Sequence, residues 1–395
     1  MAPPRVLTSP HPMALSASDP ASAAPGAAES VEACYRRCET IARAHYENFP
    51  VVSRFLSREA RRSLAAVYAF ARQADDFADE GYGPGGPTEA GRLAALDDWE
   101  RRLREACGCP AGAAKPSHPI ISAEVPRDPP GAEPGVSATI AGSATSGAGP
   151  SVNTAACGAA GMVVGPAASS PETDVAQVGA RGVLAVDPAA ADAIFAALGD
   201  TVRRHALNPA LFLDLLSAFK QDVVVRRYDT REHLLDYCRR SANPVGRIVL
   251  GIHGARDARR AGLSDAICTG LQLANFLQDI GIDRKKDRVY LPRVDRERLG
   301  VAEEDLDGAS APPALRALVL DEAAWTRTFF ERGRALLDEA PGGIGLHLSL
   351  VWHGGVRILE MIEASGGEVL GRRPKLGKAD ILRLAMRALL HRRGR

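Results

Sequence analysis

Apolar residues recur with helical spacing through most of this 395-residue chain, and almost nothing alternates with the period of two that a strand requires. In the segment 58–80, Leu64, Val67, Tyr68 and Ala71 lie three or four positions apart and therefore share one face. The pattern predicts an all-α protein, a bundle whose ligand sites are built from inward-facing side chains. Helices are predicted at 31–44, 58–80, 89–106, 188–205, 209–221, 231–240, 244–253, 264–282, 313–339, 345–365 and 379–391, with 289–291 extended.

Two segments break this pattern. Residues 1–30 and about 108–186 are rich in Ala, Gly, Pro and Ser and show little periodicity. Such segments cannot bury enough apolar surface to offset the entropy lost on ordering, so we expect disorder in both. A long segment of this kind can also be a lid. The second segment is interpreted as an insertion in a single helical domain that spans residues 31–395.

Charge and composition argue against several classes of function. The formal net charge is +1 and aromatic residues make up 5% of the chain, so a nucleic-acid partner is not expected. No stretch approaches the ~20 apolar residues that cross a bilayer, and the N-terminus lacks the apolar core of a secretory signal. The chain is expected to be soluble and cytoplasmic, with reduced cysteines that serve as apolar packing residues at Cys34, Cys38, Cys238 and Cys268.

The first candidate functional residues lie at the end of the helix predicted over 58–80. Asp75 and Asp79 are four residues apart, so their carboxylates lie one above the other and repel. The surrounding face is apolar, and a divalent cation between the carboxylates would turn the repulsion into ligation. Because the donors are hard oxygens with no His or Cys nearby, the pattern favours Mg²⁺.

A second acidic stripe begins in the helix predicted over 264–282. Gln272, Asn275, Asp279 and Asp283 follow one another at intervals of three or four residues. Mostly large apolar residues fill the positions between them, which implies burial, and buried carboxylates are costly unless they are paired or metal-bound. Each segment alone could be a solvated acidic patch or a structural ion pair. Two such stripes in one helical chain favour a metal site that binds a diphosphate.

A diphosphate site of this kind has a definite chemistry. Negative charge develops on the leaving diphosphate as the C–O bond breaks, and metal ions held between two acidic helices stabilise that charge. The carbocation left behind requires a water-poor, apolar cavity, which the centre of a helical bundle provides. The sequence therefore predicts a metal-dependent enzyme that ionises a prenyl-type diphosphate in a central apolar cavity.

At these residues the chain resembles the squalene/phytoene synthase family, head-to-head prenyl synthases of the all-helical isoprenoid synthase fold. The resemblance covers about 42–106 and 188–390 and rests on separate motifs in the family's order. Besides the two Asp motifs, they are His45–Phe49 (HYENF), Tyr68–Arg72 (YAFAR), Tyr237–Cys238 (YC), Ser241–Gly246 (SANPVG) and Arg288–Pro292 (RVYLP).

The resemblance implies roles for individual residues. It implies that Mg²⁺ and diphosphate are bound by Asp75, Asp79, Asn275, Asp279 and Asp283. It implies that Tyr68, Arg72 and Gln272 contact the diphosphate or lie close to it. Further substrate-binding candidates are His45 and Asn48, which belong to the HYENF motif, and, more weakly, Arg373. Tyr237 matches an active-site tyrosine and joins the four aspartates as a catalytic candidate. The residues alone leave an alternative open: Tyr68 and Tyr237 could be core aromatics, and Arg72 could pair with Asp76.

Within the family, the segments 47–51, 241–246 and 275–279 look most like the hydroxysqualene synthase branch of bacterial hopanoid biosynthesis. That resemblance implies ionisation of presqualene diphosphate, rearrangement of the cation and capture by water to give hydroxysqualene. A sister enzyme would supply presqualene diphosphate, and a flavin-dependent reductase would use the product. Gln278 and Val356 stand where condensing members tend to carry Arg and Tyr, which argues against condensation of two substrates.

Two other functions fit the same sequence. One is head-to-head condensation of two prenyl diphosphates to presqualene diphosphate, dehydrosqualene or phytoene. The other is a non-catalytic helical subunit of a squalene-forming assembly. Because the product would be a C30 lipid, peripheral contact with the inner face of a membrane is also expected. Arg372, Arg373, Lys375 and the tail 392–395 could touch anionic head groups or form a solvated helix end.

Overall fold

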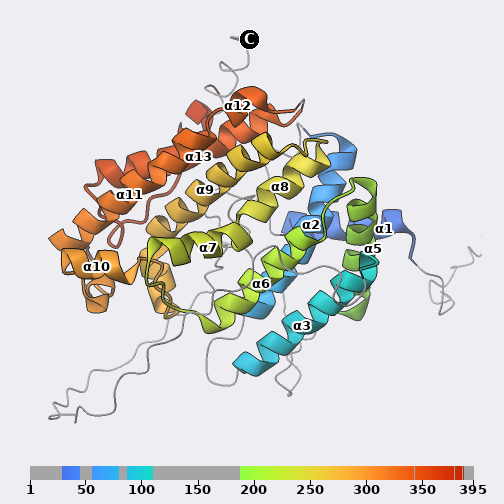
Figure 1. The fold of residues 1–395 in the computed structure, drawn as a ribbon, viewed down its shortest axis with the longest axis horizontal. Coiled ribbons are helices and arrows are strands. Elements are labelled where there is room, and N and C mark those ends of the chain that lie inside the picture. Colours follow the sequence, from blue (N-terminus) through green and yellow to red (C-terminus); the bar gives the residue numbers. More distant parts are fainter. Residues whose placement is uncertain are drawn as a thin grey trace, which may run out of the picture.

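The computed structural model describes residues 29–44, 56–79, 87–109, 187–341, 343–377, 379–384 and 386. Within this part of the chain the only pairing of extended segments is one parallel bridge between Arg227 and Val289 (Figure 1). The α-helices are α1 Val31–Ala44, α2 Arg58–Asp79, α3 Glu89–Ala106, α5 Pro188–Arg204, α6 Ala210–Val224, α7 Arg231–Ser241, α8 Asn243–Ile252, α9 Ala258–Lys285, α10 Arg293–Leu299, α11 Pro313–Gly333, α12 Leu336–Glu339 and α13 Gly345–Ala364. A short 3-10 helix, η3, spans Glu303–Leu306. The predicted all-α fold and the extended segment at 289–291 are confirmed.

Polar residues at the helix starts explain where several helices begin. The side chains of Thr88, Asp187, Thr230 and Asp257 accept hydrogen bonds from backbone N–H groups in the first turns of α3, α5, α7 and α9. Such caps satisfy amide groups that have no partner within the helix, and each contributes about 1 kcal/mol. These boundaries are therefore set by local sequence.

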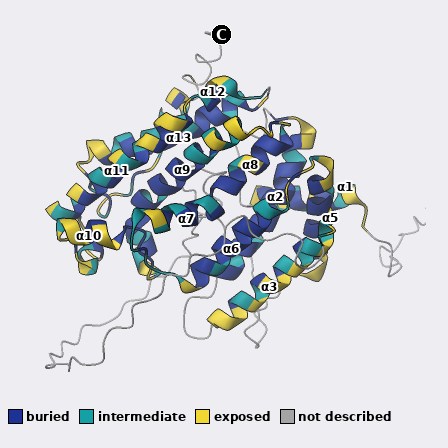
Figure 2. Ribbon diagram, in the orientation of Figure 1, coloured by how far each residue is buried: buried dark blue, intermediate teal, exposed yellow. Residues whose placement is uncertain are grey.

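Helix α9 lies at the centre of the described bundle and packs against α8, α11 and α13, while α2 packs against α1, α3, α5, α6 and α8 (Figure 1). Figure 2 shows α6 and α9 as buried along much of their length, with exposed residues more frequent on α3 and α10. Both Asp75 on α2 and Asp279 on α9 are 5% exposed. The two acidic motifs thus occupy buried positions on interior helices.

The predicted and the observed helices differ most in three places. Helix α9 begins at Ala258, because Asp257 caps it there. The segment predicted as one helix over 313–339 forms α11 and α12, which separate after Gly333. A Cβ on Gly333 would lie 2.5 Å from Ile267 of α9, so glycine allows α11 to end in close contact with α9. The sequence pattern does not predict α10 or η3, since residues 293–306 contain few apolar residues at helical spacing.

Several predictions concern residues that the structure does not describe. These residues are 1–28, the predicted insertion at 110–186, and 387–391 of the last predicted helix. The interpretation of the chain as one interrupted domain therefore stays a prediction.

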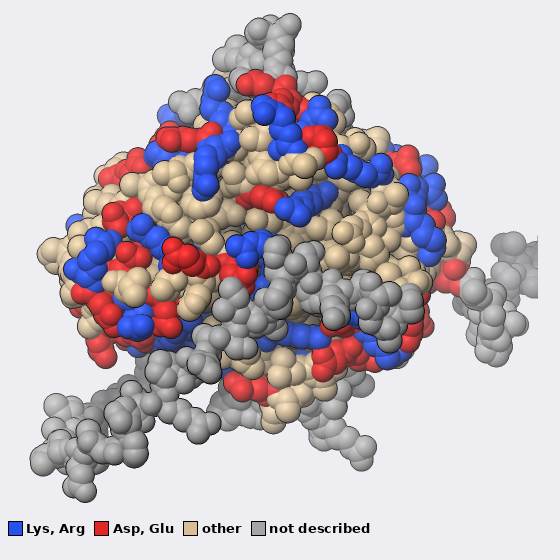
Figure 3. All heavy atoms as spheres, in the orientation of Figure 1, with Lys and Arg blue, Asp and Glu red and all other residues tan. Residues whose placement is uncertain are grey.

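Charges of both signs are interspersed over the face drawn in Figure 3, in agreement with a formal net charge of +1. No helix among the described residues is long and apolar enough to cross a membrane. The cysteines expected to serve as packing residues are buried, free thiols: Cys34, Cys38, Cys238 and Cys268.

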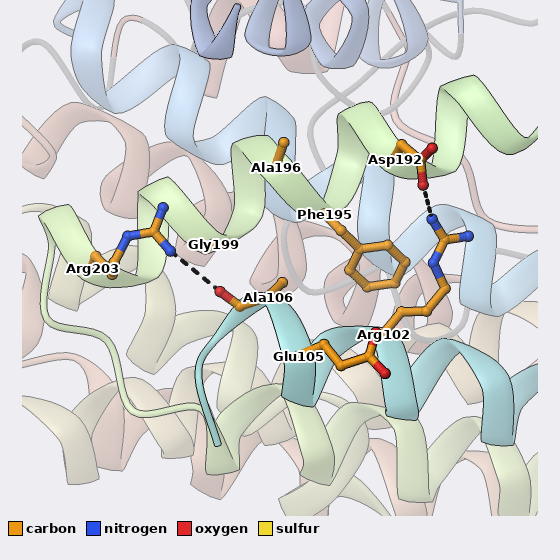
Figure 4. A pocket seen from close by; sticks show the side chains of 8 residues that line it. All are labelled: Arg102, Glu105, Ala106, Asp192, Phe195, Ala196, Gly199 and Arg203. Carbon is orange, nitrogen blue, oxygen red and sulfur yellow. Dashed lines mark hydrogen bonds and ion pairs between the residues drawn. The ribbon is translucent and has the colours of Figure 1, made fainter. Parts of the chain in front are cut away.

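Helices α3 and α5 pack side by side and run in the same direction (Figure 4). Arg102 pairs with Asp192 at 2.5 Å, and further along both helices Arg203 donates a hydrogen bond to the Ala106 carbonyl at 3.3 Å. Gly199 permits this approach, because a Cβ there would lie 2.7 Å from the same carbonyl oxygen. The interface opens into a surface pocket of about 370 Å³. This pocket is built from the helices that precede and follow residues 110–186 in the sequence.

Candidate active site

The first acidic motif lies at the C-terminal end of α2, where Asp79 contacts two basic residues from the segment after α9. Lys286 Nζ lies 3.0 Å from Asp79 Oδ2, and Arg288 Nη2 lies 2.7 Å from Asp79 Oδ1. Only 12% of the Asp79 side chain and 2% of the Arg288 side chain are exposed. These buried ion pairs join the end of α2 to the end of α9.

The second motif forms a polar stripe along α9. Asn275 Nδ2 donates a hydrogen bond to Asp279 Oδ2 at 3.0 Å, and the other oxygen of Asp279 pairs with Arg373. Asp283, one turn further, is buried just before the basic residues that contact Asp79. At the other end of the stripe, Gln272 is buried and neither atom of its side-chain amide has a hydrogen-bond partner among the described residues.

The two motifs act on one another electrostatically. Burial, and then the charge of Asp79, raises the pKa of Asp75 well above its usual value, and Arg72 opposes the rise. Burial, and then the charge of Asp279, raises the pKa of Asp283, and the charge of Asp79 adds to that rise. Asp79 on α2 therefore lies close enough to affect carboxylates on both helices. The two motifs thus share one electrostatic environment, although no three of the four predicted carboxylates lie within 4.8 Å of one another in the described part of the chain.

Arg72 and Tyr68 are buried on the same helix as the first motif. Arg72 Nη2 lies 2.5 Å from Asp76 Oδ1, and its Nη1 lies 3.6 Å from Asp75 Oδ2. The alternative in which Arg72 pairs with Asp76 is confirmed, and the same guanidinium also stays beside Asp75. A role for Arg72 or Tyr68 in binding substrate stays a prediction.

A cluster of aromatic side chains lies beside the acidic stripe. The ring of Tyr290 stacks on that of Phe276 with centroids 3.9 Å apart, and the rings of Tyr237 and Tyr228 lie 6.0 and 5.5 Å from Tyr290. Tyr237 is thus a core aromatic, as the alternative interpretation held, and it also lies next to the stripe because Phe276 directly follows Asn275 on α9. We call Tyr228, Tyr237, Phe276 and Tyr290 the aromatic cluster.

One cavity connects the aromatic cluster with the acidic stripe. Its volume is about 10 Å³, and its lining includes Asp283 and Arg288 together with Phe276 and Tyr290. The carboxylate and the guanidinium therefore border the same space as the two stacked rings. The larger apolar cavity predicted for the centre of the bundle stays a prediction.

Asp222 on α6 is a further candidate, which the sequence patterns do not single out. The hydroxyl of Tyr237 donates a hydrogen bond to Asp222 Oδ2 at 2.8 Å. Burial raises the pKa of Asp222 to about 7, although the nearby charge of Arg288 opposes the rise. The only signal in the sequence is an acidic residue near the end of α6, preceded by Lys220 and Gln221, and such a residue by itself does not indicate a function.

Lys286 and Arg288 are also functional candidates that the sequence reasoning missed. Arg288 begins the RVYLP motif that carries part of the family resemblance, but the pattern alone assigns it no role. Its contact with Asp79 depends on how the chain turns after α9, and this turn places Asp287 at a positive φ of 56°. Only the three-dimensional structure brings these cations to the first motif.

Gln278 and Val356 occupy the positions where the resemblance indicates a specialised branch. Gln278 Nε2 donates a hydrogen bond to the Pro374 carbonyl at 2.5 Å, which ties the segment after α13 to α9. The neighbouring residue in that segment is Arg373, which pairs with Asp279. A cation beside the second motif therefore comes from the C-terminal segment. Val356 is partly buried against the hydrophobic core.

A second acidic group lies elsewhere in the described part of the chain. Oxygen atoms of Asp295, Asp321 and Glu322 lie within 4.8 Å of one another. Arg231 lies 2.8 Å from Asp321, 2.9 Å from Glu322 and 3.4 Å from Asp295. Arg298 also pairs with Asp295 and Asp321, so two guanidinium groups offset part of the negative charge. We interpret this group as a structural ion-pair network that joins α7, α10 and α11.

The predicted substrate contacts His45 and Asn48 lie outside the described residues.

The family model for squalene/phytoene synthase matches residues 42–130 and 169–380. The chain belongs to the squalene/phytoene synthase family. Members of this family are enzymes that act on prenyl diphosphates, and this membership confirms the resemblance seen in the sequence motifs. It also removes support from the interpretation of the chain as a non-catalytic subunit.

Among individual members of the squalene/phytoene synthase family, the chain is 40% identical to a hydroxysqualene synthase of Rhodopseudomonas palustris over 161 residues, which cover 40% of this chain and 55% of that protein. It is 29% identical to a hydroxysqualene synthase of Zymomonas mobilis over 290 residues, 72% of this chain and 68% of the other. The crystal structure of squalene synthase HpnC from Alicyclobacillus acidocaldarius superposes with a TM-score of 0.59 at 31% identity, covering 85% of this chain and 95% of that one. These matches support both the fold and the hydroxysqualene branch.

Proposed function

We propose that this protein converts presqualene diphosphate to hydroxysqualene and diphosphate. The observation that carries the proposal is the meeting of the two acidic motifs at Asp79, whose carboxylate contacts Lys286 and Arg288 and influences Asp283. Carboxylates and cations gathered at one buried point suit a substrate whose leaving group is a diphosphate. The similarity to two hydroxysqualene synthases supports the choice of substrate.

The donor set fits a divalent cation. The raised pKa values of Asp75 and Asp283 indicate that the basic residues present do not offset burial and mutual repulsion. Oxygen donors on two helices match the preference of Mg²⁺, which typically combines a few carboxylates with substrate phosphate oxygens. The proposed ligands are Asp75, Asp79, Asn275, Asp279 and Asp283. When bound, Mg²⁺ would supply positive charge that stabilises the departing diphosphate.

The chain's own cations complete the proposed diphosphate site. Lys286, Arg288 and Arg373 are paired with the carboxylates proposed as metal ligands. Ligation of a metal by those carboxylates would leave the basic groups beside the diphosphate oxygens, where charge-assisted hydrogen bonds are strong. Gln272, whose buried amide has no described partner, would add a neutral donor to the same stripe.

The aromatic cluster would serve the second half of the reaction. Its buried rings exclude bulk water from the space beside Asp283, and their faces attract positive charge. A carbocation formed by loss of diphosphate would therefore meet an apolar, electron-rich wall. Tyr237 contributes both a ring and a hydroxyl to this wall.

The decisive assay is mass spectrometry of the products formed from presqualene diphosphate with and without Mg²⁺. We expect hydroxysqualene and diphosphate only when Mg²⁺ is present. A parallel incubation with farnesyl diphosphate alone tests the alternative, condensation of two substrates. Efficient turnover of farnesyl diphosphate to a C30 product would overturn the proposal in favour of condensation.

Lipid substrates and products also suggest how the enzyme meets its partners. We propose peripheral contact with the inner face of a membrane, with presqualene diphosphate supplied by a related synthase and hydroxysqualene passed to a flavin-dependent reductase. Arg372 and Lys375 are exposed and could touch anionic head groups, whereas Arg373 is engaged by Asp279. Flotation with anionic liposomes, compared with neutral ones, tests this contact.

A further inference from the structure

Asp222 is a buried carboxylate with no role in the reaction as proposed so far. It is 5% exposed on α6, and its Oδ2 accepts a hydrogen bond from the Tyr237 hydroxyl at 2.8 Å. Its Oδ1 has no hydrogen-bond partner among the described residues. An open oxygen on a buried carboxylate is costly and is therefore rare without a functional reason.

The charge of Asp222 acts on all three tyrosines of the aromatic cluster. After burial, the charge of Asp222 is the largest cause of the raised pKa of Tyr228, Tyr237 and Tyr290. The Tyr290 hydroxyl also has no hydrogen-bond partner within the described part of the chain. The open oxygen of Asp222 and this hydroxyl are polar groups that a water molecule or an alcohol can satisfy.

The cluster borders the place where diphosphate would leave. Arg288 spans the two regions, since its Nη2 pairs with Asp79 at 2.7 Å and donates to the backbone carbonyl of Asp222 at 3.0 Å. The cavity lined by Asp283, Arg288 and Tyr290 has a volume of about 10 Å³, close to the size that holds one water molecule. Ionisation and water capture would therefore take place in adjoining spaces.

We propose that Asp222, acting through the Tyr237 hydroxyl, accepts the proton released when water captures the carbocation. The inference rests on the proposed conversion to hydroxysqualene. In the capture step the water oxygen forms the new C–O bond, and the resulting oxonium loses one proton. Tyr237 takes that proton as it passes its own to Asp222, so the step yields a neutral alcohol and a neutral carboxyl group. The carboxyl group returns the proton to solvent when the products leave.

The surroundings of Asp222 suit a general base. Such a group works best when its pKa lies near the working pH, and burial raises the pKa of Asp222 to about 7. The charged and titratable groups that interact with it from neighbouring elements are Arg288, Asp79, Asp75, Arg240, Tyr237, Tyr228 and Tyr290. The direct hydrogen bond from Tyr237 gives the proton a path of one donor and one acceptor.

Asp222→Asn tests the proposal, because it keeps the shape and the hydrogen bond to Tyr237 but cannot take up a proton. Presqualene diphosphate and Mg²⁺ are supplied, and diphosphate release and the alcohol fraction of the products are measured separately. We expect release to persist while the alcohol fraction falls about tenfold or more, replaced by hydrocarbons formed by direct proton loss. A merely structural role would reduce both quantities together and leave the product ratio unchanged.

Two further variants keep the outcome clear. Tyr237→Phe removes the relay hydroxyl and should lower the alcohol fraction in the same way, even if Asp222→Asn fails to fold. Asp214→Asn, which alters another buried carboxylate on α6, should leave the fraction unchanged. An unchanged fraction in both Asp222→Asn and Tyr237→Phe would overturn this inference alone. If the unaltered enzyme forms no hydroxysqualene, the proposed function is wrong, and this inference fails with it.

Discussion

Arg288 holds the carboxylate of Asp79 at 2.7 Å, so a residue just beyond α9 fixes the last turn of α2. The same guanidinium donates to the backbone of α6 at Asp222. One buried side chain thus joins three helices that surround the proposed site. Its replacement should affect both stability and turnover.

Arg288→Gln should lower the free energy of unfolding by about 3 kcal/mol, because it leaves the buried carboxylate of Asp79 with one cation fewer. Urea denaturation measures this change, and diphosphate release should fall in the same variant. Arg327→Gln, which breaks a more exposed pair with Glu363, should cost less than about 1 kcal/mol. Equal losses in the two variants would contradict the central role of Arg288.

Asp283→Asn should raise the Mg²⁺ concentration needed for half-maximal diphosphate release by about tenfold or more, since it removes a proposed ligand. Chelation of divalent cations should abolish release by the unaltered enzyme. A metal titration of activity measures both effects. Asp98→Asn on the exposed face of α3 is the control and should leave the titration unchanged. Unaltered Mg²⁺ dependence in Asp283→Asn would remove this residue from the ligand set.

Arg373→Gln should have opposite effects on metal binding and turnover. The guanidinium occupies one oxygen of Asp279, so its removal should tighten the binding of Mg²⁺ or Mn²⁺ to the free protein, roughly threefold for a partly exposed pair. Turnover should nevertheless fall, because a cation beside the diphosphate is lost. Calorimetry and the product assay measure the two effects. The control, Arg372→Gln at the exposed neighbour, should change neither metal binding nor turnover. Weaker metal binding in Arg373→Gln would show that Arg373 and the metal do not compete for Asp279.

Glu322 should make the fold less stable as pH rises. Burial raises its pKa to about 7 from the usual 4.5, despite the opposing charge of Arg231. Between these two values the folded state holds a proton that the unfolded state has lost, so stability falls as pH increases through this window. Thermal melts at pH 5 and pH 7.5 should show a smaller decline for Glu322→Gln than for the unaltered protein. Parallel declines would show that Glu322 does not contribute.

Local patterns predicted the parts of the site that lie on single helices. The three- and four-residue spacing from Gln272 to Asp283 places these side chains on one face of α9 whatever surrounds the helix. The caps at Thr88 and Asp257 likewise act within one turn. These features depend on neighbours in sequence, so the sequence alone indicates them.

Contacts between distant segments could not be predicted in the same way. Lys286 and Arg288 reach Asp79 only because the chain turns after α9, and Asp222 meets Tyr237 only because α6 packs against α7. Gln278 holds the Arg373 segment through a backbone carbonyl, which no residue pattern marks. Tertiary packing decides these partners, and the packing depends on the whole bundle.

The parallel course of α3 and α5 sets a lower limit on the connection between them. Ala106, at the end of α3, lies against Gly199 and Arg203, well past the start of α5 at Pro188. The start of α5 therefore lies about 17 Å back along that helix from the end of α3, at 1.5 Å per helical residue. The connection between the two helices must span this distance. A fully extended crossover needs at least about five residues for this distance. A tight turn in place of 110–186 would force the two helices apart, whereas a Gly/Ser linker of about ten residues would leave their contact intact.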